Sequence, residues 1–134
     1  MKNILFVCKY NRFRSQVAEQ FFKKYNPKKS ISVSSAGIFQ GEFPLDKTQV
    51  KAAKEFGIDI MKRPEPIKIS NLMNVDLIVI VAKDVPKEIF KYNGKYLQKI
   101  VVWKISDVFF GSIVKNKKVI SLIEKRVKIM IDKL

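Results

Sequence analysis

The residues best suited to chemistry lie in one short segment near the start of the chain, residues 8–15. The segment begins with Cys8, the single cysteine, follows an apolar run at residues 4–7, and ends in Arg14 and Ser15. Helical spacing begins directly after it. A thiol between a strand end and a helix start lies near backbone N–H groups and the positive end of the helix dipole, which favour its ionised form. The same surroundings bind a phosphate-like dianion. The segment therefore predicts a nucleophile and an oxyanion site in one loop.

The side chains of this segment suit the transfer of a phosphoryl group. The thiolate of Cys8 would attack phosphorus in line and form a phosphocysteine. The planar guanidinium of Arg14 would hold two phosphate oxygens, a geometry that lysine cannot copy. Ser15 would donate its hydroxyl to the thiolate, and Asn11 would adopt the left-handed backbone of a tight loop. A carboxyl group elsewhere must then protonate the leaving alcohol and later activate water.

The composition of the chain excludes several other catalytic schemes. It contains no histidine, so Ser-His-Asp catalysis, Cys-His catalysis and imidazole metal sites are excluded. One cysteine forms neither an internal disulfide nor a zinc cluster, and we expect no metal and no cofactor. Lysine and arginine number 27 against 12 acidic residues, a net charge of +15 that attracts anions. We expect phosphate, sulfate or vanadate-like anions in the loop. The single thiol and the lack of an apolar stretch of ~18 residues predict a cytoplasmic protein with no membrane partner.

Alternating strands and helices must position this loop. Four apolar segments have the length and composition of strands: residues 2–7, 31–36, 77–82 and 99–103. Four other segments show helical spacing or caps: residues 15–25, 46–56, 84–92 and 113–134. Because the strands are nearly all continuously apolar and alternate with helices, we expect one α/β domain over residues 1–134, with a parallel sheet covered on both faces.

Topology brings a second reactive group to the same place. Ligand sites in such sheets lie beyond the carboxyl ends of the strands. Cys8 follows the first predicted strand and Asp107 follows the fourth. The sequence therefore predicts that the thiol and this carboxyl group lie at one edge of the sheet.

At these residues the chain resembles the low-molecular-weight protein tyrosine phosphatase family, whose fold is shared with thioredoxin-coupled arsenate reductases. Residues 7–15 match its V-C-x5-R-S signature, and residues 107–111, D-V-F-F-G, are similar to its D-P-Y-Y-G motif. Weaker similarities lie at residues 34–37, 55–59 and 76–79. The resemblance covers nearly the whole chain. It implies a three-layer α/β/α fold with a four-stranded parallel sheet and a phosphate-binding loop after the first strand, and it implies that Asp107 is the general acid.

The same resemblance implies a hydrolase of phosphotyrosine-like aryl phosphates, either in a phosphorylated protein or in a small molecule. Together with the catalytic Cys8, Arg14 and Asp107, we expect substrate contacts from the loop and the second motif: Lys9, Tyr10, Asn11, Arg12, Phe13, Ser15 and Phe109. Two positions depart from the family pattern. Tyr10 replaces a usual glycine and would be strained if that position requires positive φ. Val108 replaces proline, which removes a constraint on the acid loop.

Two alternative functions remain open at this stage. The first is arsenate reduction, because arsenate resembles phosphate in shape and charge. With one cysteine in the chain, that reaction requires an external thiol. The second is a non-catalytic basic module that binds nucleic acid or a phosphorylated partner, with a strong dependence on salt. Nucleic acid is the less favoured partner, because the sequence contains no recognised RNA-binding pattern.

Overall fold

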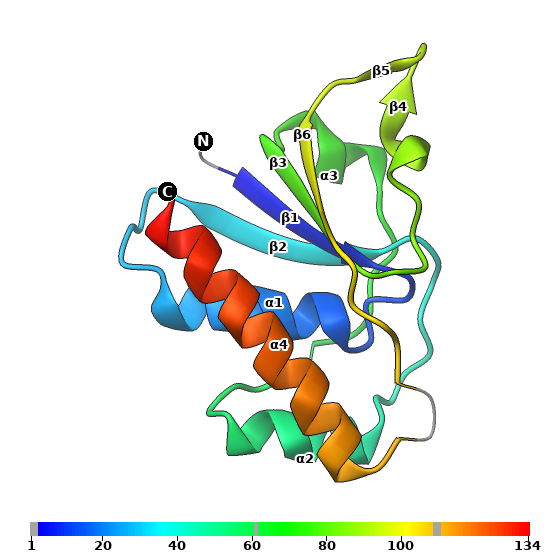
Figure 1. Ribbon diagram of the computed structural model, residues 1–134. Coiled ribbons are helices and arrows are strands. Elements are labelled where there is room, and N and C mark those ends of the chain that lie inside the picture. Colours follow the sequence, from blue (N-terminus) through cyan, green and yellow to red (C-terminus); the bar gives the residue numbers. More distant parts are fainter. Residues whose placement is uncertain (1–2, 61, 109–110) are drawn as a thin grey trace.

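The centre of the molecule is a parallel sheet of four strands in the order β2-β1-β3-β6 (Figure 1). The computed structural model describes residues 3–60, 62–108 and 111–134. The strands are β1 (Asn3–Cys8), β2 (Ser32–Gly37), β3 (Leu77–Val81) and β6 (Lys99–Trp103). All three pairings are parallel, so the predicted four-stranded parallel sheet is confirmed. The first predicted strand included Lys2, which lies outside the described residues. Because β1 is an inner strand, Cys8 leaves the sheet at its middle.

One face of the sheet carries the large helices α1 (Arg14–Tyr25) and α4 (Ile113–Asp132), with α2 (Lys47–Glu55) packed on α4 (Figure 1). Alternate residues of β1 point to this face, where Phe6 packs against Phe22 and Trp103. Burial of each such side chain contributes about 1.5–3 kcal/mol to folding. This core fixes the start of α1, and so the end of the Cys8 loop.

The other face is covered by shorter segments. Its core includes Leu5 and Val7 of β1 and Ile78 and Ile80 of β3, all fully buried. Above them pack α3 (Ile69–Met73), the 3₁₀ turn η1 (Lys87–Phe90) and neighbouring loops. Both faces of β1 and β3 are therefore buried, which is why these strands are continuously apolar in the sequence.

The predicted helix at residues 84–92 is wrong. Only the η1 turn forms there, and it is followed by a hairpin of β4 (Lys91–Tyr92) and β5 (Lys95–Tyr96). Asn93 and Gly94 connect these strands with positive φ angles of 50° and 76°. This Asn-Gly pair is a strong signal for a two-residue hairpin turn, and it prevails over the short apolar spacing.

The ends of α2 follow their local sequence signals as predicted. The carboxylate of Asp46 accepts hydrogen bonds from the backbone N–H groups of Thr48 (2.8 Å) and Gln49 (3.1 Å). This cap satisfies donors that the first helical turn leaves free. Gly57, two residues beyond the helix, has φ of 75°, the left-handed conformation that ends many helices. Among all helices of the described residues, α2 included, none is both long and apolar enough to cross a membrane.

Candidate active site

A cavity of about 220 Å³ opens at the carboxyl edge of the sheet. It is lined by residues from β1, the following loop, α1, α2 and the segment after β6: Cys8, Tyr10, Arg12, Phe13, Arg14, Asp46, Gln49, Asp107 and Val108. The thiol, the guanidinium and the carboxyl group singled out in the sequence therefore share one cavity.

Cys8 is almost wholly buried, with 2% of its surface exposed, yet it lines this cavity. Its Sγ lies 3.0 Å from the hydroxyl oxygen of Ser15. That hydroxyl accepts a hydrogen bond from Asn11 Nδ2 at 2.8 Å, which leaves the proton of Ser15 free to point at sulfur. This places the Ser15 hydroxyl where it can donate to sulfur, the role that the sequence analysis expects of it.

The buried side chain of Asn11 connects the loop to neighbouring segments. Its φ is 57°, so the predicted left-handed position is confirmed. Its Nδ2 also donates to the hydroxyl of Ser35 on β2 at 3.0 Å, and its Oδ1 accepts from the backbone N–H of Glu65 at 3.1 Å. The loop is thereby tied both to the sheet and to the segment before α3.

The network continues to an ion pair beneath the loop. The hydroxyl of Ser35 donates to Glu19 of α1, which is 4% exposed. The ammonium of Lys62 donates to the carbonyl of Ser35 at 3.0 Å and lies 3.6 Å from the carboxylate of Glu19. Because the buried carboxylate is both hydrogen-bonded and paired with a cation, its burial is tolerated.

Two glycines leave room for the loop backbone. A Cβ on Gly37 would lie 2.6 Å from the carbonyl carbon of Tyr10, and one on Gly41 would lie 2.3 Å from its carbonyl oxygen. Tyr10 itself is free of the strain considered above, because the positive φ falls on the next residue, Asn11. Tyr10 is 36% exposed and lines the cavity, and its ring centroid lies 6.0 Å from that of Phe39.

Arg14 is the first residue of α1 and is 2% exposed. Its Nη1 donates to the carboxylate of Asp84 at 2.9 Å and to the carbonyl of Ile105 at 3.0 Å. Its Nη2 lies 3.6 Å from the carboxylate of Asp107. One end of the guanidinium is thus fixed by the protein, while the other end is directed toward the predicted acid.

Asp84 is a site residue that the sequence analysis missed. Burial raises its pKa, but the hydrogen bond and positive charge of Arg14, its own backbone hydrogen bond and the charge of Lys9 together lower that pKa below the ordinary 3.8. Asp84 follows β3 at the edge of the sheet where Cys8 ends β1. The topology rule that identified Asp107 could therefore have identified it too.

The carboxyl group of Asp107 lies beyond the end of β6. Its side chain is 19% exposed and accepts a hydrogen bond from the backbone N–H of Val108 at 2.9 Å. Gly111 packs directly against the side chain of Val108, since a Cβ at position 111 would lie 2.0 Å from Val108 Cγ1. Phe109, a predicted substrate contact, lies outside the described residues.

The other predicted contacts divide into two groups. Tyr10, Arg12 and Phe13 line the cavity, and Phe13 is also part of the core beneath it. The side chains outside the lining support the loop or lie beside it: Lys9, Asn11 and Ser15. Asp46 and Gln49 line the cavity without having been predicted to do so. The sequence identified Asp46 only as a helix cap, which it also is.

No group of three or more His, Cys, Asp or Glu side chains that could hold a metal ion occurs within residues 3–60, 62–108 and 111–134. The cavity brings together a thiol, a guanidinium and a carboxyl group, a set suited to attack on a tetrahedral oxyanion.

Comparisons with known proteins agree with this geometry. The structure of a low molecular weight protein tyrosine phosphatase from T. tengcongensis is 27% identical, covers 100% of both chains and has a TM-score of 0.86. An arsenate reductase in the phosphate binding state is 29% identical, with a TM-score of 0.80 over 99% of this chain and 98% of that one. The curated arsenate reductase of Bacillus subtilis is 40% identical over 84 residues, which cover 62% of this chain and 58% of that relative.

The curated glutaredoxin arsenate reductase of Synechocystis is 36% identical over 80 residues, 59% of each chain, so this chain matches less than two thirds of the length of these curated relatives. The family model described as low molecular weight phosphotyrosine protein phosphatase matches residues 3–134, nearly the whole sequence. From this match and the shared fold, we conclude that the chain belongs to the low molecular weight phosphotyrosine protein phosphatase family.

Proposed function

We propose that this protein is a cysteine-dependent phosphatase of aryl phosphate monoesters, with Cys8 as nucleophile, Arg14 as the phosphate-binding group and Asp107 as general acid and base. One observation carries the proposal. The side chains of Cys8 and Arg14, from one loop, and of Asp107, from a segment far away in the sequence, line a single cavity of about 220 Å³. A related structure is described as an arsenate reductase in the phosphate binding state, which supports the binding of a phosphate-like oxyanion by a protein of this fold.

In the first step the Cys8 thiolate attacks phosphorus. The S–P bond forms as the bond from phosphorus to the aryl oxygen breaks, and that oxygen takes the proton of Asp107. The guanidinium of Arg14 stabilises the charge on the phosphoryl oxygens. Because Asp84 and Ile105 already hold its Nη1, little reorganisation is needed when that charge develops.

In the second step water attacks the phosphocysteine. The carboxylate of Asp107, now deprotonated, accepts a proton from the water as the new P–O bond forms. The S–P bond breaks, and the electron pair returns to sulfur as a thiolate that the Ser15 hydroxyl can stabilise. Phosphate then leaves, and Asp107 holds the proton for the next turnover.

An aromatic leaving group suits the walls of the cavity. Tyr10 lines the cavity, and its ring lies 6.0 Å from that of Phe39 between the ring centres, so aromatic side chains stand at this side of the cavity. An aryl group bound to phosphate could pack against the Tyr10 ring.

The direct test is turnover of p-nitrophenyl phosphate and its inhibition by vanadate. We expect hydrolysis by the native protein and a loss on the order of 10⁴-fold or more in kcat for Cys8→Ser, because the covalent step is removed. Circular dichroism provides the control that the variant is folded. Equal turnover by the two proteins would refute the proposal.

Arsenate reduction is a second candidate, because curated relatives at 36–40% identity are named arsenate reductases. The Cys8 thiolate would displace water from arsenate to form an S–As(V) bond. An external thiolate would then attack the Cys8 sulfur, which releases arsenite with the electron pair and leaves a mixed disulfide that a second external thiol reduces. External thiols are required because the chain has one cysteine. Formation of arsenite from arsenate with added thiol would favour this reaction.

A further inference from the structure

A second cavity, of about 340 Å³, lies beside the active-site cavity. Its apolar lining comes from the segment before α2 and from one helical residue: Phe43, Pro44, Leu45 and Val50. Its remaining lining residues are the three exposed lysines of α2: Lys47, Lys51 and Lys54. With Val50, these lysines have the spacing i, i+3, i+4 and i+7, which places them on one face of the helix. The cavity therefore combines an apolar floor with a cationic rim.

The two cavities share a wall. Asp46 and Gln49 line the active-site cavity, while the adjoining Lys47 and Val50 line the second cavity. Arg12, which also lines the active-site cavity, donates a hydrogen bond to the carbonyl of Pro44 at 3.0 Å. Residues 43–50 thus separate the cavities and contact both. A peptide with one residue in the active site would need only a few further residues to reach the second cavity.

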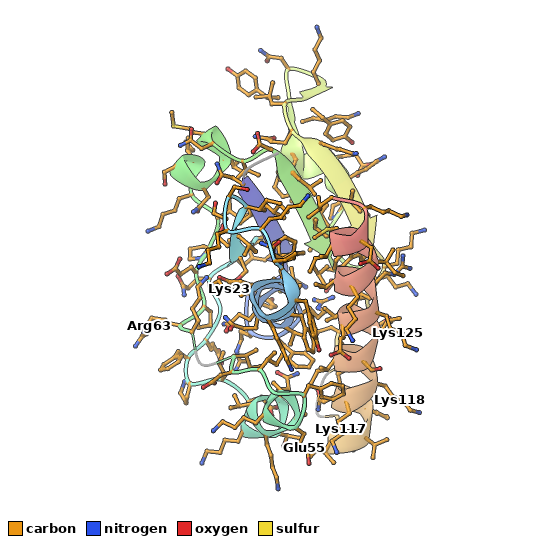
Figure 2. The ribbon with its side chains drawn as sticks, turned by 90° about the vertical axis from the view of Figure 1, so that its left-hand side faces the viewer. Lys23, Glu55, Arg63, Lys117, Lys118 and Lys125 are labelled. Atoms are coloured by element: carbon orange, nitrogen blue, oxygen red, sulfur yellow. The ribbon has the colours of Figure 1, made fainter. Side chains whose placement is uncertain are left out.

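The cationic side chains around this cavity outnumber the carboxylates near it. The guanidinium of Arg63 lies 4.5 Å from the centre of the Phe43 ring, and Figure 2 shows this side chain extending away from the body of the molecule. The nearby carboxylates of Asp46 and Glu55 are engaged, the first as the cap of α2 and the second with Lys117 at 2.6 Å. Glu42, which precedes Phe43 in the sequence, adds one negative charge to this segment. The complementary ligand is apolar at one point and acidic around it.

We propose that this cavity binds an apolar side chain within an acidic segment of a phosphorylated protein, next to the phosphorylated residue that enters the active site. This inference rests on the proposed phosphatase function and names its class of substrate. The apolar floor would bury the side chain, and the lysines would pair with flanking carboxylates. A second copy of this chain is a poor occupant, because its net charge is +15.

The test uses three synthetic phosphotyrosine peptides. The first has a leucine near the phosphotyrosine and several aspartates around it. The second replaces the leucine with serine, and the third replaces the aspartates with asparagines. We measure kcat/KM for each and divide it by the value for p-nitrophenyl phosphate with the same enzyme. We expect the first peptide to exceed the other two by about tenfold, since each of them lacks one of the two contacts.

A pair of matched variants then locates the effect. Lys51→Gln with Lys54→Gln neutralises two rim lysines, while Lys118→Gln with Lys125→Gln makes the same charge change on α4. Figure 2 shows Lys118 and Lys125 on the side of the molecule away from Arg63. We expect the rim pair to lose the preference for the acidic peptide and the α4 pair to keep it. No preference in the native protein, or equal loss in both pairs, would overturn the inference.

A binding measurement keeps the inference testable even if the protein hydrolyses no aryl phosphate. The unphosphorylated leucine-aspartate peptide is titrated into ¹⁵N-labelled protein, and the amide signals of residues 43–54 are followed. Shifts confined to this segment support the inference. A second titration uses decanoate. No shift with the peptide would overturn the inference, and shifts with decanoate but not with the peptide would assign the cavity to an anionic amphiphile instead.

Discussion

The two segments that supply the reactive groups are held in different ways. In the Cys8 loop, Asn11, Arg14 and Ser15 are nearly or wholly buried and bonded to β2, to the segment before α3 and to the chain after β3 and β6. The carboxyl group of Asp107 is 19% exposed, bonds to its neighbour Val108 and lies 3.6 Å from Arg14. The proposed nucleophile and anion-binding group are therefore held by contacts with several parts of the fold, whereas the proposed acid is held by fewer contacts.

This difference agrees with the demands of the proposed reaction. Stabilisation of the phosphoryl oxygens gains most from groups that are already in place, because their orientation then costs little during the reaction. A proton donor needs only to come within hydrogen-bond distance of the leaving oxygen. Changes to the buried loop should consequently have larger effects than changes to the acid segment.

The most severe test of the comparison is Arg14→Lys. Lysine keeps the positive charge but cannot bridge Asp84, Ile105 and the phosphoryl oxygens in one plane. We expect kcat for p-nitrophenyl phosphate to fall by about 10³-fold, with the variant still folded. Steady-state kinetics and circular dichroism measure both quantities. A loss smaller than that of Asp107→Asn would reverse the ranking proposed here.

The acid segment is tested by Asp107→Asn. Asparagine keeps the shape and removes the transferable proton, so we expect kcat/KM, which covers the steps up to formation of the phosphocysteine, to fall by about 10²-fold for substrates with poor leaving groups. For p-nitrophenyl phosphate, whose leaving group needs little protonation, the loss in kcat/KM should be clearly smaller. A series of substituted phenyl phosphates gives the slope of log kcat/KM against leaving-group pKa. An identical slope in native and variant proteins would remove Asp107 from this role.

Two substitutions at one buried position separate hydrogen bonding from backbone conformation. Asn11→Gly keeps the positive φ and deletes the side chain that joins Ser15 and Ser35, so we expect the free energy of unfolding to fall by about 1–3 kcal/mol. Asn11→Ala should lose about 1–2 kcal/mol more, because alanine is strained at φ of 57°. Urea unfolding measures both. A native-like stability for Asn11→Gly would mean that the side chain does not hold the loop.

The smallest expected effect is the pH dependence of Asp84→Asn. The folded-state pKa of Asp84 lies below its ordinary 3.8, so its ionised form stabilises the folded protein above that pH. This contribution is lost as pH falls through the lower folded-state pKa. We expect the variant to be less stable by about 1 kcal/mol at neutral pH, since the side chain of Asp84 is partly exposed. Urea unfolding from pH 7 to pH 2.5 should show the two stabilities converging at the acidic end, and a constant difference would contradict this origin.

The sequence predicted the sheet and the meeting of Cys8, Arg14 and Asp107, because continuous apolar strands and one topological rule determine both. It did not predict that Asp84 holds Arg14, since that contact depends on the direction of a side chain after β3. It also placed a helix at residues 84–92, where the Asn93-Gly94 turn favours a hairpin. Lining by Gln49 could not be predicted either, because it depends on how α2 sits against the loop.

The close approach of Gly37 and Gly41 to the peptide of Tyr10 bears on attempts to transplant this site into another scaffold. Residues 8–15 would not keep this conformation in a new scaffold by themselves. The backbone of Tyr10 packs against Gly37 and Gly41, and a β-carbon at either position would collide with it. A graft would have to bring residues 35–41 as well. The functional unit for protein engineering is therefore a pair of neighbouring segments from two adjacent strands, joined where their backbones touch.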